Sequence, residues 1–527
     1  MSVASGRIAL VLLSRLAATR TALAATRSRN AKRDLIAEVL RDASAADVHI
    51  VVAYLSGGLR QRRTGVGWRT LQHAPPPAAE PSLTVSEVDD AFAVMAELSG
   101  AGSSNARAEA VRDLFARATA EEQQFLFGLV SGELRQGAME AAVQDGLAVA
   151  YAVPLAAVRR AAMLLSSTTS AAAVLLQGGL PALEAVGLQV GTGIQPMLAA
   201  SAPDPGGAVT KTGLPVLVDH KLDGVRVQVH RDGDGVRIFT RSLDDITNRL
   251  PGVAEAVRGL PQNRLVLDGE VLAMAADGRP EVFQVVASRA MSELDPAGPA
   301  PDNPLQVFFF DLLHADGRDL LDTPLRDRLT MMAEVLPEAL TVPRQVCATE
   351  EEVAARFAEA VADGYEGVVI KNLSAPYVAG RRDAAWVKIK PRHTFDLVVT
   401  AAEWGHGRRQ GWLSNLHLAA PDPDTGELVM LGKTFKGLTD ELLTWQTERF
   451  LELETRRDRY TVYLEPSTVV EIACDGLQIS TRYPGGVALR FARVLRYRPD
   501  KTAAEADTIT TVKALSPILP AVADREG

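Results

Sequence analysis

The sequence predicts a multidomain protein in which an all-α domain precedes a mixed α+β domain and an all-β domain. The chain has 527 residues, more than one hydrophobic core usually supports, so about three domains are expected. Apolar residues follow a helical spacing up to about residue 190 and alternate with polar residues beyond residue 216. We therefore place the domains at 1–190, 191–392 and 393–527.

The N-terminal segment has the spacing of amphipathic helices, as in Val111–Phe115 and Phe125–Val130. Its first 33 residues contain seven basic and no acidic residues, a composition shared with targeting peptides. The apolar run Ile8–Leu13 is too short for a secretory signal, and the helical pattern continues through Arg33–Leu40. We expect helices here and a cytoplasmic protein.

Alternation begins after a stretch rich in glycine and proline, 191–213. Val225–Val229 and Val236–Thr240 are separated by a turn sequence and predict a β-hairpin. Further strands are expected at 265–267, 270–274, 305–312, 367–371 and 385–390, with a helix at 351–362. This mixture predicts an α+β domain. Strands at 397–401, 416–419, 460–464 and 469–473 then indicate a small β-barrel.

Composition excludes several classes of protein. Hydrophobic residues make up 47% and charged residues 23%, as in ordinary globular proteins, and no run reaches the ~20 apolar residues of a membrane span. The two cysteines, Cys347 and Cys474, cannot build a four-thiolate zinc site or a disulfide framework. We expect no membrane partner and a reducing compartment.

The net charge of the chain and the local distribution of its charges indicate different kinds of partner. The net charge of −9 argues against binding a polyanion, yet 371–392 contains six bases and one acid, and 490–501 contains five bases and one acid. Such runs are compatible with a solvated face or with nucleic acid.

One short motif could carry chemistry. Lys221-Leu222-Asp223-Gly224 lies where one predicted strand turns into the next. A lysine attacks phosphorus only as the free amine, and its unperturbed pKa is near ~10.4. Lys388, Lys390 and a bound divalent cation would each lower the pKa of Lys221 by disfavouring a second positive charge. The tetrapeptide alone is common in turns, so it needs support from other motifs.

That support is an ordered series of motifs downstream of Lys221. It consists of Arg226; Arg241-Ser242; Asp268-Gly269-Glu270; Phe308-Phe309-Phe310-Asp311; 366–371, which runs from Glu366 to Lys371; and 386–390, which runs from Trp386 to Lys390. In this order the series resembles the covalent nucleotidyltransferase superfamily of ATP-dependent DNA ligases, RNA ligases and mRNA-capping enzymes. The resemblance implies that Lys221 becomes adenylylated, with ATP as substrate and Mg²⁺, or Mn²⁺ in its place, as the metal.

The resemblance also assigns roles around Lys221. Asp219 stands where the family usually has a glutamate that contacts the base. Phe310 is suited to stack on adenine, and Glu270 and Glu366 to bind the metal or the ribose hydroxyls. Cationic contacts to ribose and phosphate oxygens are expected from Arg226, Arg241, Lys371, Lys388 and Lys390.

The flanking regions narrow the resemblance. The segment 490–501 is similar to the last family motif, a basic strand of an OB-fold domain that orients pyrophosphate, with Arg490, Arg493, Arg496 and Lys501 as candidates. Segments 102–107 and 131–137 resemble the helical DNA-binding domain of the larger ATP-dependent DNA ligases. Expected DNA contacts are Gly102, Ser103, Arg135, Gly137, Arg289 and a minor-groove wedge at Phe283.

Ordinary helix capping is the alternative explanation for the small residues at 102–107 and 131–137. The position that aligns with a second wedge is occupied by Leu438 rather than by an aromatic residue.

The whole pattern most resembles three-domain ATP-dependent DNA ligases of the actinobacterial type. The resemblance implies an enzyme that seals 3′-OH/5′-phosphate nicks through lysyl-AMP and AMP–DNA, in repair, replication or recombination. Its partner would be nicked double-stranded DNA, encircled by a monomer associated with the nucleoid. Two alternatives remain open: another covalent nucleotidyltransferase acting on RNA ends or transferring GMP, and a DNA-binding protein that has lost catalysis.

Overall fold

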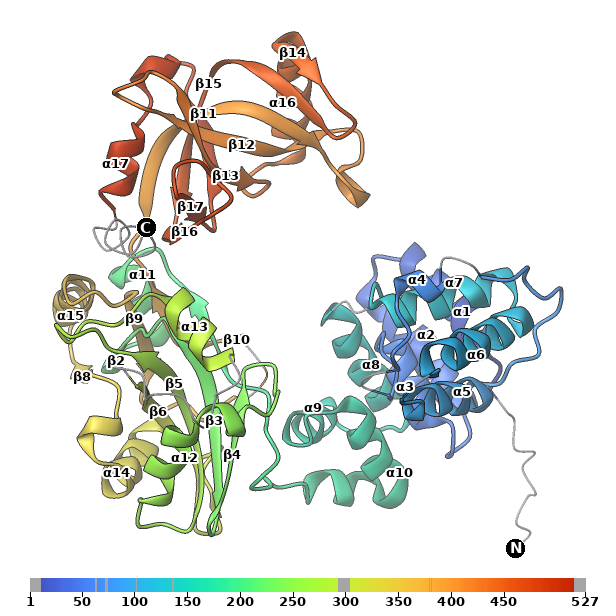
Figure 1. Cartoon of the computed structure of the whole chain (residues 1–527). Coiled ribbons are helices and arrows are strands. Elements are labelled where there is room, and N and C mark those ends of the chain that lie inside the picture. Colours follow the sequence, from blue (N-terminus) through green and yellow to red (C-terminus); the bar gives the residue numbers. More distant parts are fainter. Residues whose placement is uncertain are drawn as a thin grey trace, which may run out of the picture.

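The computed structural model describes residues 11–515 except 62–63, 72–73, 101, 135–136, 292–303, 379 and 381. Three bodies are visible in Figure 1: a helical one in blue and teal, a mixed one in green and yellow beside it, and a β-rich one in orange and red above the mixed one. The predicted sequence of all-α, α+β and all-β architecture is therefore confirmed. The domain limits themselves remain predictions.

The helical body is built around one core that includes Leu13, Phe92, Phe115 and Leu126. Two of its helices begin with reciprocal threonine–glutamate capping, at Thr84 and Thr119, which satisfies otherwise unpaired N–H groups. The helices are α1 (Leu13–Ala25), α2 (Arg29–Asp42), α3 (Val48–Leu55), α4 (Trp68–Leu71), α5 (Val85–Glu97), α6 (Ser103–Arg117), α7 (Ala120–Ser131), α8 (Gly137–Ala150), α9 (Leu155–Leu164) and α10 (Thr168–Glu184).

Within the described part of the chain, no helix alone combines the length and apolar composition that crossing a membrane requires. The consecutive helices α9 and α10 meet those criteria only as a pair, with a bend of 120° between them.

The mixed body contains two five-stranded sheets. The first has the order β1-β10-β9-β2-β8 and the second β4-β3-β5-β6-β7. The strands are β1 (Leu198–Ser201), β2 (Val216–His220), β3 (Val225–Asp232), β4 (Gly235–Thr240), β5 (Arg264–Ala273), β6 (Leu305–Ala315), β7 (Arg318–Asp319), β8 (Arg344–Cys347), β9 (Val368–Asn372) and β10 (Arg382–Ile389). The helices are α11 (Pro205–Thr212), α12 (Pro251–Arg258), α13 (Phe283–Met291), α14 (Leu325–Val335) and α15 (Glu350–Ala362).

The two strands predicted at 265–267 and 270–274 are one strand, β5. Asp268 and Gly269 continue its pairing with both β3 and β6. Nearly all of β5 is buried on both faces, so the alternation that marks a half-exposed strand is missing and sequence reading placed a break there.

The β-rich body has a six-stranded sheet in the order β13-β12-β11-β15-β14, with β18 also paired to β15, and a separate hairpin, β16–β17. Its strands are β11 (His393–Trp404), β12 (Leu413–Pro421), β13 (Leu428–Thr434), β14 (Glu454–Arg457), β15 (Thr461–Cys474), β16 (Gly476–Ile479), β17 (Val487–Arg490) and β18 (Arg493–Tyr497). Helices α16 (Asp440–Glu452) and α17 (Ile509–Lys513) accompany them.

Strand β15 joins the two strands predicted at 460–464 and 469–473. Its pairing with β11 shifts register between Tyr463 and Thr468, where the exposed stretch around Pro466 bulges outward. Proline cannot donate a ladder hydrogen bond and is accommodated at such a bulge.

Candidate active site

A cleft of about 800 Å³ is lined by residues from both sheets of the mixed body, by α13 and by the end of hairpin β16–β17. Twelve side chains predicted from the sequence line it. They are Asp219, Lys221, Arg226, Arg241, Glu270, Phe283, Phe310, Glu366, Lys371, Lys388, Lys390 and Arg490.

Lys221 is held at the turn between β2 and β3 by backbone pairing with the segment before β9. Its N–H donates to the Gly367 carbonyl at 2.8 Å, and the Glu366 N–H donates to the Lys221 carbonyl at 3.1 Å. Gly367 has a φ of +135°, and a Cβ there would lie 2.2 Å from the Ile389 carbonyl oxygen. Only glycine allows the two segments to approach this closely, so the backbone itself sets Lys221 beside Glu366.

Carboxylates and ammonium groups alternate around the Lys221 amine. Glu366 forms an ion pair with Lys221 through one oxygen and accepts a hydrogen bond from Lys390 through the other. Lys390 also lies 3.1 Å from the Asp475 carboxylate, which the β-rich body contributes. Burial alone would lower the pKa of Lys390, but the Glu366 and Asp475 carboxylates raise it overall. Lys390 is therefore a permanent cation next to the predicted nucleophile. The predicted loss of the Lys221 proton stays a prediction.

Glu270 occupies the wall formed by β5. One of its oxygens accepts the Gly224 N–H at 2.9 Å. Burial raises the pKa of Glu270 to about 7, against the lowering influence of Lys221. A carboxyl group with this pKa exchanges its proton near neutral pH and needs a cation or a donor to be fully ionised.

The opposite end of the cleft is aromatic and contains a buried ion pair. The Lys371 ammonium lies 2.6 Å from the Asp219 carboxylate, and each side chain is only 2–3% exposed. Lys371 also sits over the rings of Phe310 (4.7 Å) and Trp386 (4.3 Å). Burial lowers the pKa of Lys371, while Asp219 opposes the shift. Lys371 is thus engaged next to the aromatic residues, and a role at the triphosphate would require this pair to open.

Arg226 forms a second fixed cation behind Phe310. It is bidentate to Asp268, at 3.1 and 2.7 Å, and its third nitrogen donates to the Met197 carbonyl at 2.8 Å. Tyr377 donates to the same Asp268 carboxylate at 2.6 Å. Burial disfavours the charge, but Asp268 raises the pKa of Arg226 above its ordinary value. This network fixes the guanidinium 5.3 Å from the centre of the Phe310 ring.

The β-rich body closes over the cleft through specific contacts. Arg490 donates to both oxygens of Asp223, at 2.7 and 3.3 Å. The Gln284 side chain exchanges two hydrogen bonds with the backbone of Ile479, at 3.0 and 3.1 Å. Together with the Lys390–Asp475 contact, these interactions hold hairpin β16–β17 against the Lys221 turn and α13.

Several predicted residues lie elsewhere. Arg496 is on the outer strand β18, paired with Glu471 and 63% exposed, away from the cleft. Gly102 caps α6 with a φ of +86°, Ser103 begins α6, and Gly137 begins α8, all in the helical body. Arg289 belongs to α13 but does not line the cleft. Arg135 lies outside the described residues.

Sequence reading missed four contributors to the site: Trp386, Asp268, Tyr377 and Asp475. Trp386 and Asp268 stand inside quoted motifs, but nothing in their spacing distinguishes a wall of the cleft from a core residue. Tyr377 and Asp475 reach the site through tertiary contacts alone. The proposed second wedge position, Leu438, is 8% exposed and belongs to the core of the β-rich body.

The described residues contain no preformed group of three or more His, Cys, Asp or Glu side chains arranged to hold a metal ion. Glu270 and Glu366 are nevertheless hard oxygen donors on the cleft wall. Mg²⁺ commonly uses one or two carboxylates together with substrate phosphates, so these side chains fit a cation that arrives with a nucleotide.

Comparison with known proteins decides the family. The model of the ATP dependent DNA ligase domain matches residues 196–390, that of the ATP dependent DNA ligase C terminal region matches 409–501, and that of the DNA ligase N terminus matches 70–148. A probable DNA ligase of Beutenbergia cavernae is 60% identical over 96% of this chain and 100% of its own length. The chain belongs to the ATP-dependent DNA ligases.

Other relatives agree with this assignment. A probable DNA ligase of a Nocardioides species is 57% identical over 96% of the ligase described here and 99% of its own length. The solved structure of Pmar-Lig_PreS3 covers 92% of the ligase and 99% of its own chain with a TM-score of 0.62, at 20% identity. That likeness supports the fold over nearly the whole chain. The ligase uses ATP, and DNA is its substrate.

Proposed function

We propose that this ligase seals nicks in double-stranded DNA through a covalent Lys221–AMP intermediate. The observation that carries the proposal is the position of Lys221: its amine lies in the cleft beside Glu366 and Lys390, under the Arg490 contact from the β-rich body. The cleft is large enough for a nucleotide. It is lined by the Lys221 nucleophile, by two cations, Lys390 and Arg490, and by two carboxylates, Glu270 and Glu366.

In the first step the Lys221 nitrogen attacks the α-phosphorus of ATP. An N–P bond forms, the bond from phosphorus to the bridging β-phosphate oxygen breaks, and pyrophosphate leaves with the electron pair. The amine must release its proton, and Glu366, already in contact with it, is the nearest acceptor. Lys388, Lys390 and Arg490 lie in the same cleft and would neutralise the charge on the departing pyrophosphate.

In the second step an oxygen of the DNA 5′-phosphate attacks the same phosphorus and displaces Lys221, which regains a proton. The product is AMP–DNA. In the third step the 3′-hydroxyl attacks the DNA phosphate, and AMP leaves as the new phosphodiester forms. DNA needs the space that hairpin β16–β17 occupies here, so the β-rich OB domain must swing away after the first step.

Base and sugar recognition follow from the walls of the cleft. Phe310 and Trp386 meet edge to face, with ring centres 6.0 Å apart, and offer an aromatic site for adenine. The Asp219–Lys371 pair beside them supplies an acceptor and a donor for the base edge. Glu270 accepts from the ribose hydroxyls or binds the metal. Arg241 is exposed at the cleft margin, where it can reach phosphate.

Mg²⁺ would be held by Glu366 and Glu270 once phosphate oxygens complete its coordination. When bound it supplies positive charge that weakens the bond to the leaving pyrophosphate.

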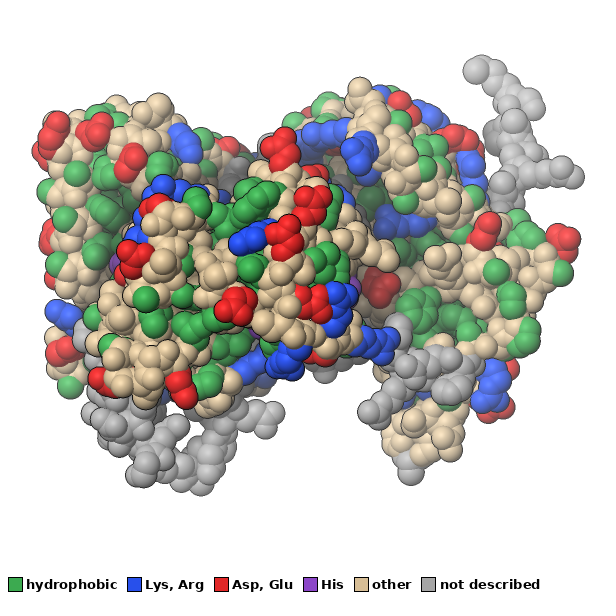
Figure 2. Space-filling view, turned by 90° about the horizontal axis from the view of Figure 1, so that it is seen from above, with side chains coloured by type: hydrophobic (Ala, Val, Ile, Leu, Met, Phe, Trp, Pro, Cys, Tyr) green, Lys and Arg blue, Asp and Glu red, His purple; other side chains and the backbone are tan. Residues whose placement is uncertain are grey.

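The three domains, taken as 1–190, 191–392 and 393–527, would surround the duplex as a monomer. Figure 2 shows basic side chains on both sides of the gap between the helical body and the rest of the molecule. Gly102, Ser103, Arg135 and Gly137 from the helical domain, with Phe283 and Arg289 from α13, are the proposed DNA contacts. Such a clamp suits repair, replication or recombination at the nucleoid.

The chemistry is tested by offering the purified ligase α-labelled ATP, GTP or NAD with Mg²⁺. We expect label from ATP alone, lost in acid and stable in base as a phosphoramidate, and mapped by mass spectrometry to the peptide that contains Lys221. The Lys211→Ala protein is a matched control, because Lys211 is an exposed lysine of α11 outside the cleft. Label on any other residue, or none, contradicts the proposal.

Glu270 predicts a pH dependence of nucleoside binding. Its pKa is raised to about 7, so the carboxylate form, which accepts from ribose, increases as pH rises through 7. We expect adenosine affinity to increase about ten-fold between pH 6 and pH 8, measured by ligand-observed NMR without metal. Adenosine carries no phosphate that titrates in this range. The Glu270→Gln protein should bind without this dependence, and a flat profile in the parent would show that Glu270 does not contact the ribose.

A further inference from the structure

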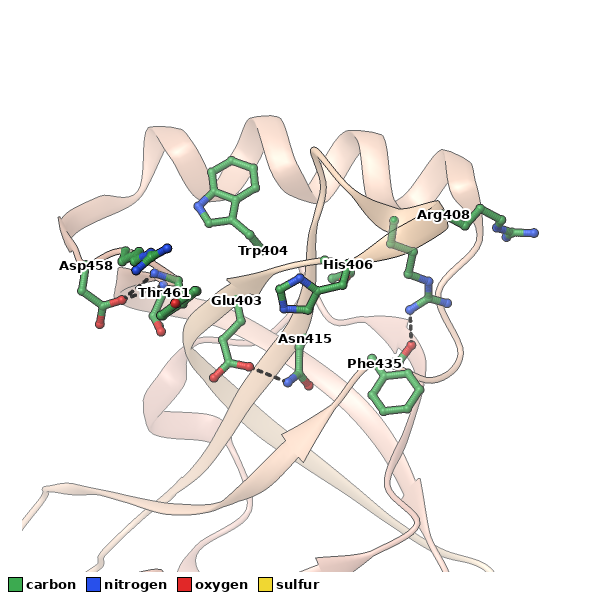
Figure 3. A pocket seen from close by; sticks show the side chains of 13 residues that line it. Glu403, Trp404, His406, Arg408, Asn415, Phe435, Asp458 and Thr461 are labelled. Atoms are coloured by element: carbon green, nitrogen blue, oxygen red, sulfur yellow. Dashed lines mark hydrogen bonds between the residues drawn. The ribbon is translucent and has the colours of Figure 1, made fainter. Parts of the chain in front are cut away.

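A second hollow lies on the OB domain, separate from the cleft that contains Lys221. It encloses about 1030 Å³ between the end of β11, the turn after β13 and the loop before β15. Among the described residues, none lines both this hollow and the cleft that contains Lys221, the adenylylation cleft. Figure 3 shows Glu403, His406 and Asn415 at its centre, Phe435 on one side and Asp458 with Thr461 on the other.

Aromatic side chains are unusually exposed at this hollow. Phe435 is 56% exposed and Tyr460 is 55% exposed, although both belong to a domain with a well-formed core. Both residues are fixed through their backbones: Arg409 donates to the Phe435 carbonyl at 2.5 Å, and Trp404 donates to the Tyr460 carbonyl at 3.0 Å. Their rings are therefore presented to solvent by a rigid frame, which is the arrangement of a stacking surface.

A third exposed ring connects the hollow with the adenylylation cleft. Phe491 is 60% exposed and has a φ of +55°, a conformation that residues with side chains rarely adopt. The ammonium of Lys436, the neighbour of Phe435, lies 5.2 Å from the centre of the Phe491 ring. Phe491 itself lines the adenylylation cleft. A strained backbone that keeps an aromatic ring in solvent indicates a binding role.

The charges around these rings suit a polyanion. Arg459 stands over Tyr460 at 5.2 Å, and the Arg408 side chain is 77% exposed at the rim. The two acids of the hollow are used internally. Glu403 accepts from Lys433, His417 and Asn415, while Asp458 accepts the N–H groups of Tyr460 and Thr461. Lys433 thus balances the charge of Glu403, whereas Asp458 keeps its charge, because hydrogen bonds from neutral N–H groups do not cancel it. Arg408 is paired with the exposed Asp440 at 3.1 Å, so Arg459 and Lys436, which lie over exposed rings, are the cations best placed to face a ligand.

We propose that Tyr460, Phe435 and Phe491 stack on the bases of unpaired DNA, with Arg459, Arg408 and Lys436 along its phosphates. Bases within a duplex hide their faces, whereas an unpaired strand can place successive bases on separated rings while its backbone follows the cations. The ligase would thereby hold a frayed or gapped strand next to the cleft. This binding goes beyond nick sealing and does not depend on lysyl-AMP.

Binding of a labelled single strand, about twelve nucleotides long, tests the proposal by fluorescence anisotropy with the full chain, without nucleotide or metal. An abasic strand of equal length and charge is the reference, at the same salt concentration. We expect the parent to prefer the strand with bases about ten-fold or more. Phe435→Ala and Tyr460→Ala should each reduce that preference by about five-fold or more.

Matched controls separate stacking from general effects. Leu495→Ala removes an exposed apolar side chain of β18 that lines neither the hollow nor the adenylylation cleft, and Arg449→Ala removes a cation of α16. Both variants should prefer the strand with bases as strongly as the parent does. Variants must melt like the parent and still react with ATP. Lys221→Ala should bind the strand normally, so failure of the lysyl-AMP mechanism would leave this result unchanged.

Three outcomes would overturn the proposal. The first is equal binding of the two strands by the parent. The second is an unchanged preference in the Phe435→Ala/Tyr460→Ala double variant. The third is equally effective displacement of the strand by polyglutamate of the same charge, which would identify a site for acidic polymers in general.

Discussion

Replacing Lys221 with alanine is expected to lower ATP-dependent nick sealing by at least about ten-thousand-fold, as removal of a covalent nucleophile does in other enzymes. The change deletes the only protein atom proposed to bond to the α-phosphorus. Lys221→Arg should lose as much, because arginine keeps the charge next to Glu366 but supplies no neutral amine. The measurement is sealing of a labelled nicked duplex with ATP and Mg²⁺.

A pre-adenylylated nick separates loss of the nucleophile from loss of the fold. Sealing this substrate requires only the third step of the reaction, in which the 3′-hydroxyl attacks and AMP leaves without any bond to Lys221. Lys221→Ala should therefore seal it at a rate within a few-fold of the parent. Lys211→Ala should behave as the parent with both substrates. Persistent sealing from ATP by the Lys221→Ala protein would refute the covalent mechanism.

Much of the site could be predicted because its chemistry restricts residue types locally. Lys221, Glu366 and Lys390 each stand next to the end of a strand, and Glu270 belongs to a short motif inside β5; the structure brings all four into one cleft. The helix predicted at 351–362 matches α15 for the same reason, since its apolar spacing is regular.

What could not be predicted depends on distant pairing. Lys390 and Asp475 are 85 positions apart and meet only when two domains close. The Lys371 ammonium lies 2.6 Å from the Asp219 carboxylate and over the rings of Phe310 and Trp386, a pairing that the order of the motifs did not indicate. Strand β5 was divided because burial on both faces removes the alternation. In each case the arrangement depends on tertiary packing, which the spacing of residues along the chain does not reveal.

Arg490 and Arg496 were both expected at pyrophosphate, but from their positions in the structure we expect them to behave differently. Arg490→Ala should slow self-adenylylation by about a hundred-fold or more, because Arg490 is the basic side chain that β17 inserts beside Asp223 and Lys221. Arg496→Ala should stay within a few-fold of the parent, since Arg496 pairs with Glu471 on the outer strand β18. The rate of label transfer from α-labelled ATP measures both.

Sealing of a pre-adenylylated nick again distinguishes the steps. Arg490 acts in the closed arrangement of the OB domain, which DNA must displace, so Arg490→Ala should leave this third step nearly unchanged. Gln284→Ala removes the two hydrogen bonds to Ile479 and should also weaken the closed arrangement. It should slow self-adenylylation less than Arg490→Ala does, because no charge is lost. If Arg496→Ala slowed self-adenylylation as much as Arg490→Ala, β18 would have to turn toward the nucleotide, and the closed arrangement seen here would not be the one that reacts with ATP.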